Sequence, residues 1–131
     1  MKYYNYITVE KSFDETVFDV KTALENEGFG ILSEIDMQDK FKEKLEVDFR
    51  KYLILGACNP SYAYKAVNVE DKIGLMLPCN VVVQEKEKGI IEVSAIEPVV
   101  SMSAIDNKSL LAIAVEVNQK LMKALLAIKL K

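Results

Sequence analysis

The chain has 131 residues, of which half are apolar and 28% are charged, and its formal net charge is −3. This composition fits one globular domain, residues 1–131, whose core is large enough to fold without disulfides. The negative charge and the single arginine argue against nucleic acid as a partner, and the absence of histidine excludes His-based triads and zinc sites that need imidazole.

No part of the sequence predicts export or membrane insertion. Residues 1–10 contain neither a long apolar segment nor a small-residue cleavage site. No apolar run approaches the ~18 residues of a membrane span. Two cysteines without an export signal predict a cytoplasmic protein with reduced thiols and no membrane partner.

The first part of the chain predicts a strand and then a helix. Residues 2–9 alternate loosely and are rich in aromatic and β-branched side chains, which favours a strand at or near a sheet edge. The stretch from Ser12 to Glu15 has the form of a capping box and predicts a helix that begins at Phe13. We expect Gly28 to end this helix in the left-handed conformation.

The middle of the chain alternates between strand and helix patterns. Residues 29–37 predict a second strand, and 38–46 predict a short surface helix or turn. The apolar run 52–57 predicts a central strand covered on both faces. Asn59 precedes a proline and is expected to cap a helix over 60–69. The side chains that this helix is expected to bury are Ala63, Ala66 and Val67.

The last part predicts a hairpin followed by a long helix. Residues 73–77 are strand-like, with Pro78 marking a bulge or edge. Strands at 81–85 and 90–96 flank a charged turn and form an antiparallel hairpin. A helix capped by Asp106 or Ser103 then runs to about Lys129. Its expected buried stripe is Leu110, Ala114, Val117, Leu121, Leu125 and Ile128, with Leu111, Val115, Met122 and Leu126 beside it.

Two apolar runs each end in a Cys-Asn pair, in Gly56-Ala57-Cys58-Asn59-Pro60 and in Leu77-Pro78-Cys79-Asn80-Val81. With Glu34-Ile35-Asp36 and Lys44-Leu45 before them, these motifs resemble family 302 of the domains of unknown function along nearly the whole chain. The chain departs from the family pattern at Glu46, where the family tends to have Gly after Lys-Leu, so the conformation of that turn is open.

The resemblance implies a bacterial or archaeal protein with a TATA-binding-protein-like arrangement, usually a homodimer, and no established activity. The implied order β-α-β-β-β-β-α agrees with the elements above. The predicted fold class is therefore α+β, an antiparallel-rich twisted sheet with a long C-terminal helix packed across it and short extra helices after Asp36 and Asn59.

The two cysteines allow two interpretations. Cys58 and Cys79 fit small buried residues at strand ends, which is common for free cysteine. They also fit a thiolate or metal site, because a helix N-terminus near Cys58 favours the thiolate. With Glu34 or Asp36 they would suit zinc or copper(I), although two thiolates fall short of the four ligands of a closed zinc site.

The other candidate residues also have a structural alternative. Asn59 is explained by capping, whereas Asn80 either closes a turn or points into a pocket. Glu34 and Asp36 lie on the same side of a strand, so they could share a cation or act as an acid and base pair, or simply be wet strand positions.

The favoured function is binding of a small, partly apolar ligand by a dimeric domain, in a cleft between sheet and long helix. The alternative is a thiol-based metal-binding or redox protein that uses Cys58 and Cys79. Nucleic-acid binding by analogy of fold is disfavoured by the charge. No catalytic set is complete, which leans against an enzyme, and no cofactor is indicated. The candidate ligand-binding residues are Cys58, Asn59, Cys79, Asn80, Glu34 and Asp36.

Overall fold

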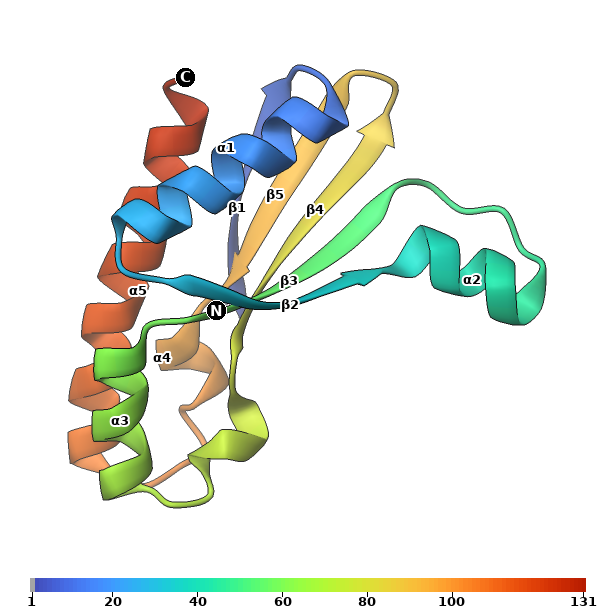
Figure 1. The fold of residues 1–131 in the computed structure, drawn as a ribbon. Coiled ribbons are helices and arrows are strands. Elements are labelled where there is room, and N and C mark those ends of the chain that lie inside the picture. The colour runs from blue at the N-terminus through green and yellow to red at the C-terminus, as the bar shows by residue number, and fades with distance from the viewer. Residues whose placement is uncertain (1) are drawn as a thin grey trace.

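The computed structural model describes residues 2–131 and contains a five-stranded antiparallel sheet with two long helices packed on one face (Figure 1). The strand order is β1-β5-β4-β3-β2, so β1 and β2 are the edges. This architecture confirms the predicted α+β class and the edge position of the first strand. The strands are β1 (Tyr4–Glu10), β2 (Gly30–Asp36), β3 (Tyr52–Cys58), β4 (Cys79–Glu87) and β5 (Ile90–Ile96).

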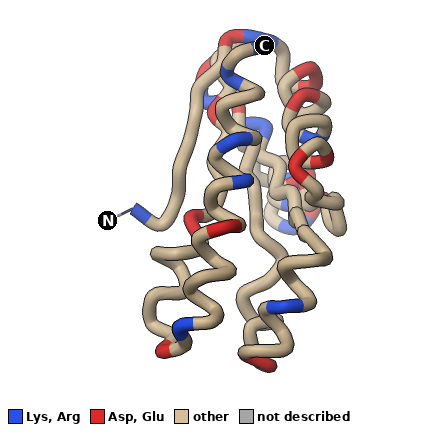
Figure 2. Tube along the Cα trace, turned by 90° about the vertical axis from the view of Figure 1, so that its left-hand side faces the viewer, with Lys and Arg blue, Asp and Glu red and all other residues tan. Residues whose placement is uncertain are grey.

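The helices occupy the connections between strands and the C-terminal end of the chain. They are α1 (Phe13–Asn26), α2 (Met37–Leu45), α3 (Pro60–Val69), α4 (Pro98–Ser101) and α5 (Lys108–Lys129), with one 3-10 helix, η1 (Ile73–Met76). Helices α1 and α5 pack against each other and against the sheet, while α2 lies on an arm beyond β2 and β3 (Figure 1). Viewed onto the helices, basic and acidic positions are interspersed (Figure 2). Within residues 2–131, none of the helices has the length and apolar character that crossing a membrane requires.

Helix α1 begins and ends as its sequence predicts. The Ser12 Oγ accepts a hydrogen bond from the Glu15 N–H at 3.1 Å, as in a capping box. At the other end Gly28 adopts the left-handed conformation, with φ of 88°. The Phe29 N–H donates to the Leu24 carbonyl at 2.9 Å, which satisfies one of the free carbonyls of the last turn.

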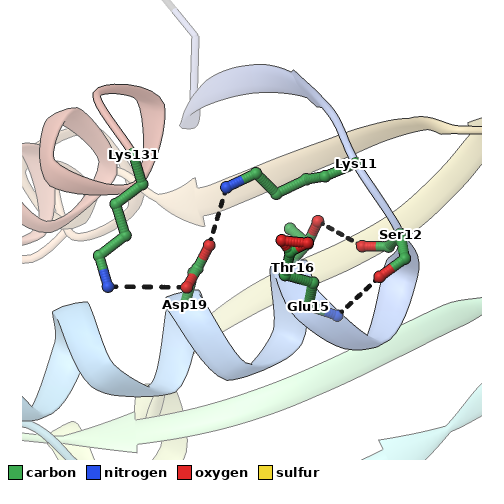
Figure 3. A network of polar contacts seen from close by, with 6 residues as sticks. All are labelled: Lys11, Ser12, Glu15, Thr16, Asp19 and Lys131. Carbon is green, nitrogen blue, oxygen red and sulfur yellow. Dashed lines mark hydrogen bonds and ion pairs between the residues drawn. The ribbon is translucent and has the colours of Figure 1, made fainter.

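A buried carboxylate, Asp19, holds α1 to the segments around it (Figure 3). Its Oδ2 lies 3.0 Å from Lys11 Nζ, and its Oδ1 lies 3.6 Å from Lys131 Nζ. A carboxylate shielded from water needs such partners to remain charged. The two lysines therefore connect α1 to the turn before it and to the C-terminal end of α5.

The core lies between the sheet and the two long helices. All six side chains expected in the buried stripe of α5 are buried, which confirms that prediction. Four of them pack against the helix-facing side chains of the sheet, which include Leu55, Val81, Val83, Ile91 and Val93; these four are Val117, Leu121, Leu125 and Ile128. A second, smaller apolar cluster lies between α3, η1 and the start of α5, with Ala66, Ile73 and Leu110 buried in it.

Two predictions in the second half of the chain were wrong. Residues 73–77 do not form a strand: they contain η1, and Ile73 is buried in the small cluster rather than paired in the sheet. The cap of α5 is Asn107 rather than Asp106 or Ser103. Its Oδ1 accepts from the Leu110 N–H at 3.1 Å, and its Nδ2 donates to the Val69 carbonyl at 2.8 Å. The second bond joins α5 to the end of α3.

Two further expectations, for β3 and for α3, differ from the structure, and the turn at Glu46 was left open by the sequence. The expectation for β3 fails because only one face of the sheet carries the long helices. Strand β3 lies between β4 and β2, but its Ile54 faces the uncovered side and is only half-buried. Helix α3 buries Ala66, whereas Ala63 is half-buried and Val67 is exposed. At the departure from the family pattern, Glu46 takes φ of 56°, the left-handed conformation that glycine adopts more readily.

Candidate functional site

The two Cys-Asn pairs lie at the same end of the sheet. Strand β3 ends at Cys58 and β4 begins at Cys79, and the two strands run antiparallel with Ala57 opposite Cys79. The two thiols are close enough for Cys58 to affect the ionisation of Cys79. Residues 21 positions apart in the sequence are thus brought together by one strand pair.

Asn59 occupies the N-cap position of α3 without capping it. Its side chain makes no hydrogen bond to the amides of that helix, which corrects the expectation from the sequence. Instead, Nδ2 donates to the Glu27 carbonyl at 3.2 Å, at the end of α1. A Cβ added at Gly28 would lie 3.0 Å from this nitrogen, so the glycine leaves room for the contact. Asn59 therefore joins the end of α1 to the start of α3.

A cavity of about 40 Å³ lies beside Cys58, Asn59 and Cys79. It is partly open to solvent, and its walls are almost wholly apolar. One wall belongs to the main core and the opposite wall to the small cluster, so the cavity lies where the two meet. The chief apolar residues around it are Phe29, Ala57, Tyr62, Ala63, Leu77, Met102, Leu110, Ile113 and Val117.

The thiol of Cys79 is held in its neutral form. Burial raises its pKa from 9.0 to about 11, and the neighbouring Cys58 adds to the shift because two thiolates would repel each other. A thiolate is the form that attacks electrophiles and binds metals. At neutral pH Cys79 is therefore a small apolar part of the cavity wall.

This raised pKa predicts a stability that depends on pH. The thiol of the unfolded chain ionises near its ordinary pKa, whereas the thiol of the folded chain ionises only near pH 11. Between these two pH values the folded chain therefore keeps a proton that the unfolded chain has lost. The resulting stabilisation is fully present below pH 9 and is lost as the pH rises to 11, by about 2–3 kcal/mol. We expect urea denaturation across this range to show a steeper loss for the wild type than for Cys79→Ala. Equal losses would contradict the shift.

The remaining candidates lie outside this cavity. Asn80 points to the opposite face of β4, where it is exposed beside a separate hollow. Glu34 is exposed on β2 and pairs with Lys21 of α1 at 2.9 Å. Asp36 caps α2, since its Oδ1 accepts from the Asp39 N–H at 3.0 Å. Within residues 2–131, no three or more Cys, Asp or Glu side chains gather as a metal site would require.

Sequence reasoning expected a cleft between the sheet and the long helix beside the Cys-Asn motifs. It did not identify Pro98 and Met102 as part of the cavity wall. Pro98 begins α4, and Met102 at the end of that helix reaches the cavity. No pattern around Met102 distinguishes a cavity wall from ordinary core.

Comparison with known proteins supports the family and offers no activity. The family model described as "Domain of unknown function DUF302" matches residues 5–128. No curated protein matches the sequence. The fold is similar to the crystal structure of an uncharacterized conserved DUF302 protein from Bacillus stearothermophilus, with a TM-score of 0.89 and 27% sequence identity. The similarity covers 97% of this chain and 98% of the other.

Proposed function

Since the chain belongs to the DUF302 family, whose function is unknown, we propose a function from its own geometry: it binds a small, mostly apolar molecule in the cavity beside Cys58, Asn59 and Cys79. The observation that carries this proposal is an apolar cavity at the meeting of two hydrophobic clusters, next to both Cys-Asn motifs. Sites of this kind take an apolar body and orient it through a few polar groups.

The dimensions and polar groups of the cavity limit the ligand. A volume of about 40 Å³ admits only a few heavy atoms unless the small cluster moves away from the main core. The first turn of α3 contributes Tyr62 and Ala63 to the wall. The Ala63 N–H donates to the Asn59 carbonyl at 2.9 Å, whereas the N–H groups of Ser61 and Tyr62 precede the first intrahelical bonds and have no partner inside the helix. These features favour a compact apolar group with one hydrogen-bond acceptor at its end.

The alternative, a thiol-based metal-binding or redox protein, fits the site less well. Such a protein needs Cys79 as a thiolate, and its pKa of about 11 opposes this near neutral pH. The two thiols also lack a third protein ligand in the described part of the chain, whereas structural zinc sites take four. The alternative predicts metal uptake that is lost in Cys58→Ser or Cys79→Ser.

Filling the cavity should abolish binding. In Ala63→Leu the added side chain enters the cavity from α3. We expect the native mass spectrum of the purified wild-type protein to show a bound small organic molecule, and the spectrum of this variant to lack it. Ala112→Leu adds the same atoms to an exposed position of α5 and should retain the mass. A wild-type protein without bound mass, or a mass that survives Ala63→Leu, would contradict the proposal.

We also propose that the protein is a homodimer, paired through β1 and the adjoining flank of α5. Helix α5 packs over β1, whose outer edge has no neighbouring strand in the described chain. Leu111, Val115, Met122 and Leu126 share one flank of α5 and are 41% to 55% exposed. A two-fold axis along this edge would pair the free strand edges and cover both apolar flanks.

Charges placed on this flank should separate the subunits. For the double variant Val115→Glu and Met122→Glu we expect light scattering after gel filtration to give the chain mass of 14.8 kDa, and twice that mass for the wild type. The reason is that carboxylates buried at an apolar contact lose their hydration without gaining a partner. Ala127→Glu, at an exposed position one turn after Lys123 and on a different side of α5, should leave the dimer intact. A wild-type monomer, or a dimer in the double variant, would contradict this interface.

A further inference from the structure

The face of the sheet opposite α1 and α5 carries a second hollow. Tyr6 lies opposite Ser94, Ser94 opposite Val82, and Val82 opposite Ile54, so these side chains share one face across four strands. The hollow on this face has a volume of about 490 Å³, far more than the cavity beside the cysteines. Its lining includes Tyr4, Tyr6, Tyr52, Asn80, Gln84 and Ser94, and thus combines aromatic rings with hydrogen-bonding groups.

The floor of this hollow is a fixed polar network. Gln84 is only 8% exposed, and its Oε1 accepts from Arg50 Nε at 2.9 Å. Its Nε2 donates to Glu92 Oε1 at 3.3 Å, and the Ser94 hydroxyl donates to the same oxygen at 3.2 Å. The carboxylate of Glu92 is therefore occupied by neighbours of its own chain, and Lys86 Nζ lies 3.8 Å from its other oxygen.

The charge around the hollow is opposite to that of the whole protein. The whole chain has a net charge of −3. The lining of the hollow, however, contains two lysines, Lys2 and Lys86, and a single acid, Glu92. Arg50 lies beside this lining and donates a hydrogen bond to Gln84. Lys2 Nζ lies 5.8 Å from the ring centroids of both Tyr4 and Tyr6. A site that combines a cation with aromatic rings can bind an anionic group through the cation and a flat apolar body against the rings.

We propose that this hollow binds a small organic anion with a planar aromatic body. The rings of Tyr4, Tyr6 and Tyr52 contact the body, and Lys2 and Lys86 pair with the anionic group. A second copy of the chain is a poorer occupant, because a two-fold contact would bring this cationic face against itself. The site is separate from the cavity beside the cysteines, so it stands or falls independently of the proposed function.

The probe that tests this site is anilinonaphthalene sulfonate, an aromatic anion whose fluorescence rises when it leaves water. We expect saturable binding by the intact protein and an affinity about fivefold weaker in Lys2→Ala, in Lys86→Ala and in Tyr6→Leu. Lys72→Ala removes an exposed lysine that pairs with Asp71 outside the hollow, and it should change nothing. Ala63→Leu should also leave this binding unchanged, which distinguishes the hollow from the smaller cavity.

Charge selectivity completes the test. The cationic dye thioflavin T, also planar and aromatic, should bind at least about fivefold more weakly than the anion, since the lysines would repel it. Equal binding of both dyes would overturn the proposal, as would an affinity for the anion that survives all three substitutions in the hollow. Loss of the signal in Ala63→Leu alone would assign the dye to the smaller cavity and would equally overturn it.

Discussion

Replacing Phe29 by Ala is expected to lower the free energy of unfolding by about 3–5 kcal/mol. Phe29 is 2% exposed and is among the largest fully buried side chains of the chain. It follows the left-handed Gly28, and its ring lies in the main core as well as at the cavity wall. The substitution loses the favourable free energy of transferring a large ring out of water, and it leaves a void that the sheet and helices cannot close.

Urea denaturation of Phe29→Ala and Phe18→Ala separates this effect from the general loss of an aromatic ring. Phe18 is 67% exposed on the outer side of α1, so its replacement should change stability by less than about 0.5 kcal/mol. Similar losses in the two variants would show that Phe29 does not hold the core as described.

Replacing Gly56 by Ala is the second large expected effect, a loss of about 1–3 kcal/mol. An added Cβ at Gly56 would lie 2.3 Å from the Ser33 Oγ and 2.8 Å from the Pro78 Cγ. The serine hydroxyl can rotate away, but the proline ring is rigid, so the backbone at the start of β4 must shift. The cost arises from overpacking, because Gly56 lies inside β3 between two partner strands.

A matched glycine tests this explanation. A Cβ at Gly74 meets nothing within 4 Å, so Gly74→Ala should be neutral or should stabilise the protein by up to about 1 kcal/mol. Combining Gly56→Ala with Ser33→Ala should recover only part of the loss, because the contact with Pro78 remains. Full recovery would assign the whole effect to the serine, and no loss in the single variant would contradict the close packing.

The sequence predicts most of the fold because local signals and tertiary packing agree over most of the chain. Ser12 and Gly28 mark the ends of α1, and the seven-residue spacing of Ala114, Leu121 and Ile128 marks the buried side of α5. The segment 73–77 was assigned wrongly because a short apolar run has no periodicity that separates strand from buried helix. Its true conformation follows from the small cluster, which forms only when α3 and α5 come together.

The candidate site was predicted in part for a related reason. Cys58 and Cys79 could be located because strand ends and helix starts are visible in the sequence, and the antiparallel pair brings them together. The contact between Asn59 and the Glu27 carbonyl joins residues 32 positions apart. The Asn-Pro signal in the sequence predicts only a local cap, which the Asn59 side chain does not form. The hollow on the open face depends on four strands in register, which no local pattern shows.

The measurement that tests the central claim most directly is a methyl carbon–proton NMR spectrum recorded under increasing pressures of xenon, a small apolar probe of dry cavities. If the cavity beside Cys58 and Cys79 is an apolar binding site, the methyl signals of Ala57, Ala63, Met102 and Ala114 will shift and saturate together. These shifts will disappear in Ala63→Leu and remain in Ala112→Leu. Shifts that stay linear with pressure, or that spread over exposed methyl groups such as those of Leu75 and Leu130, would contradict the site.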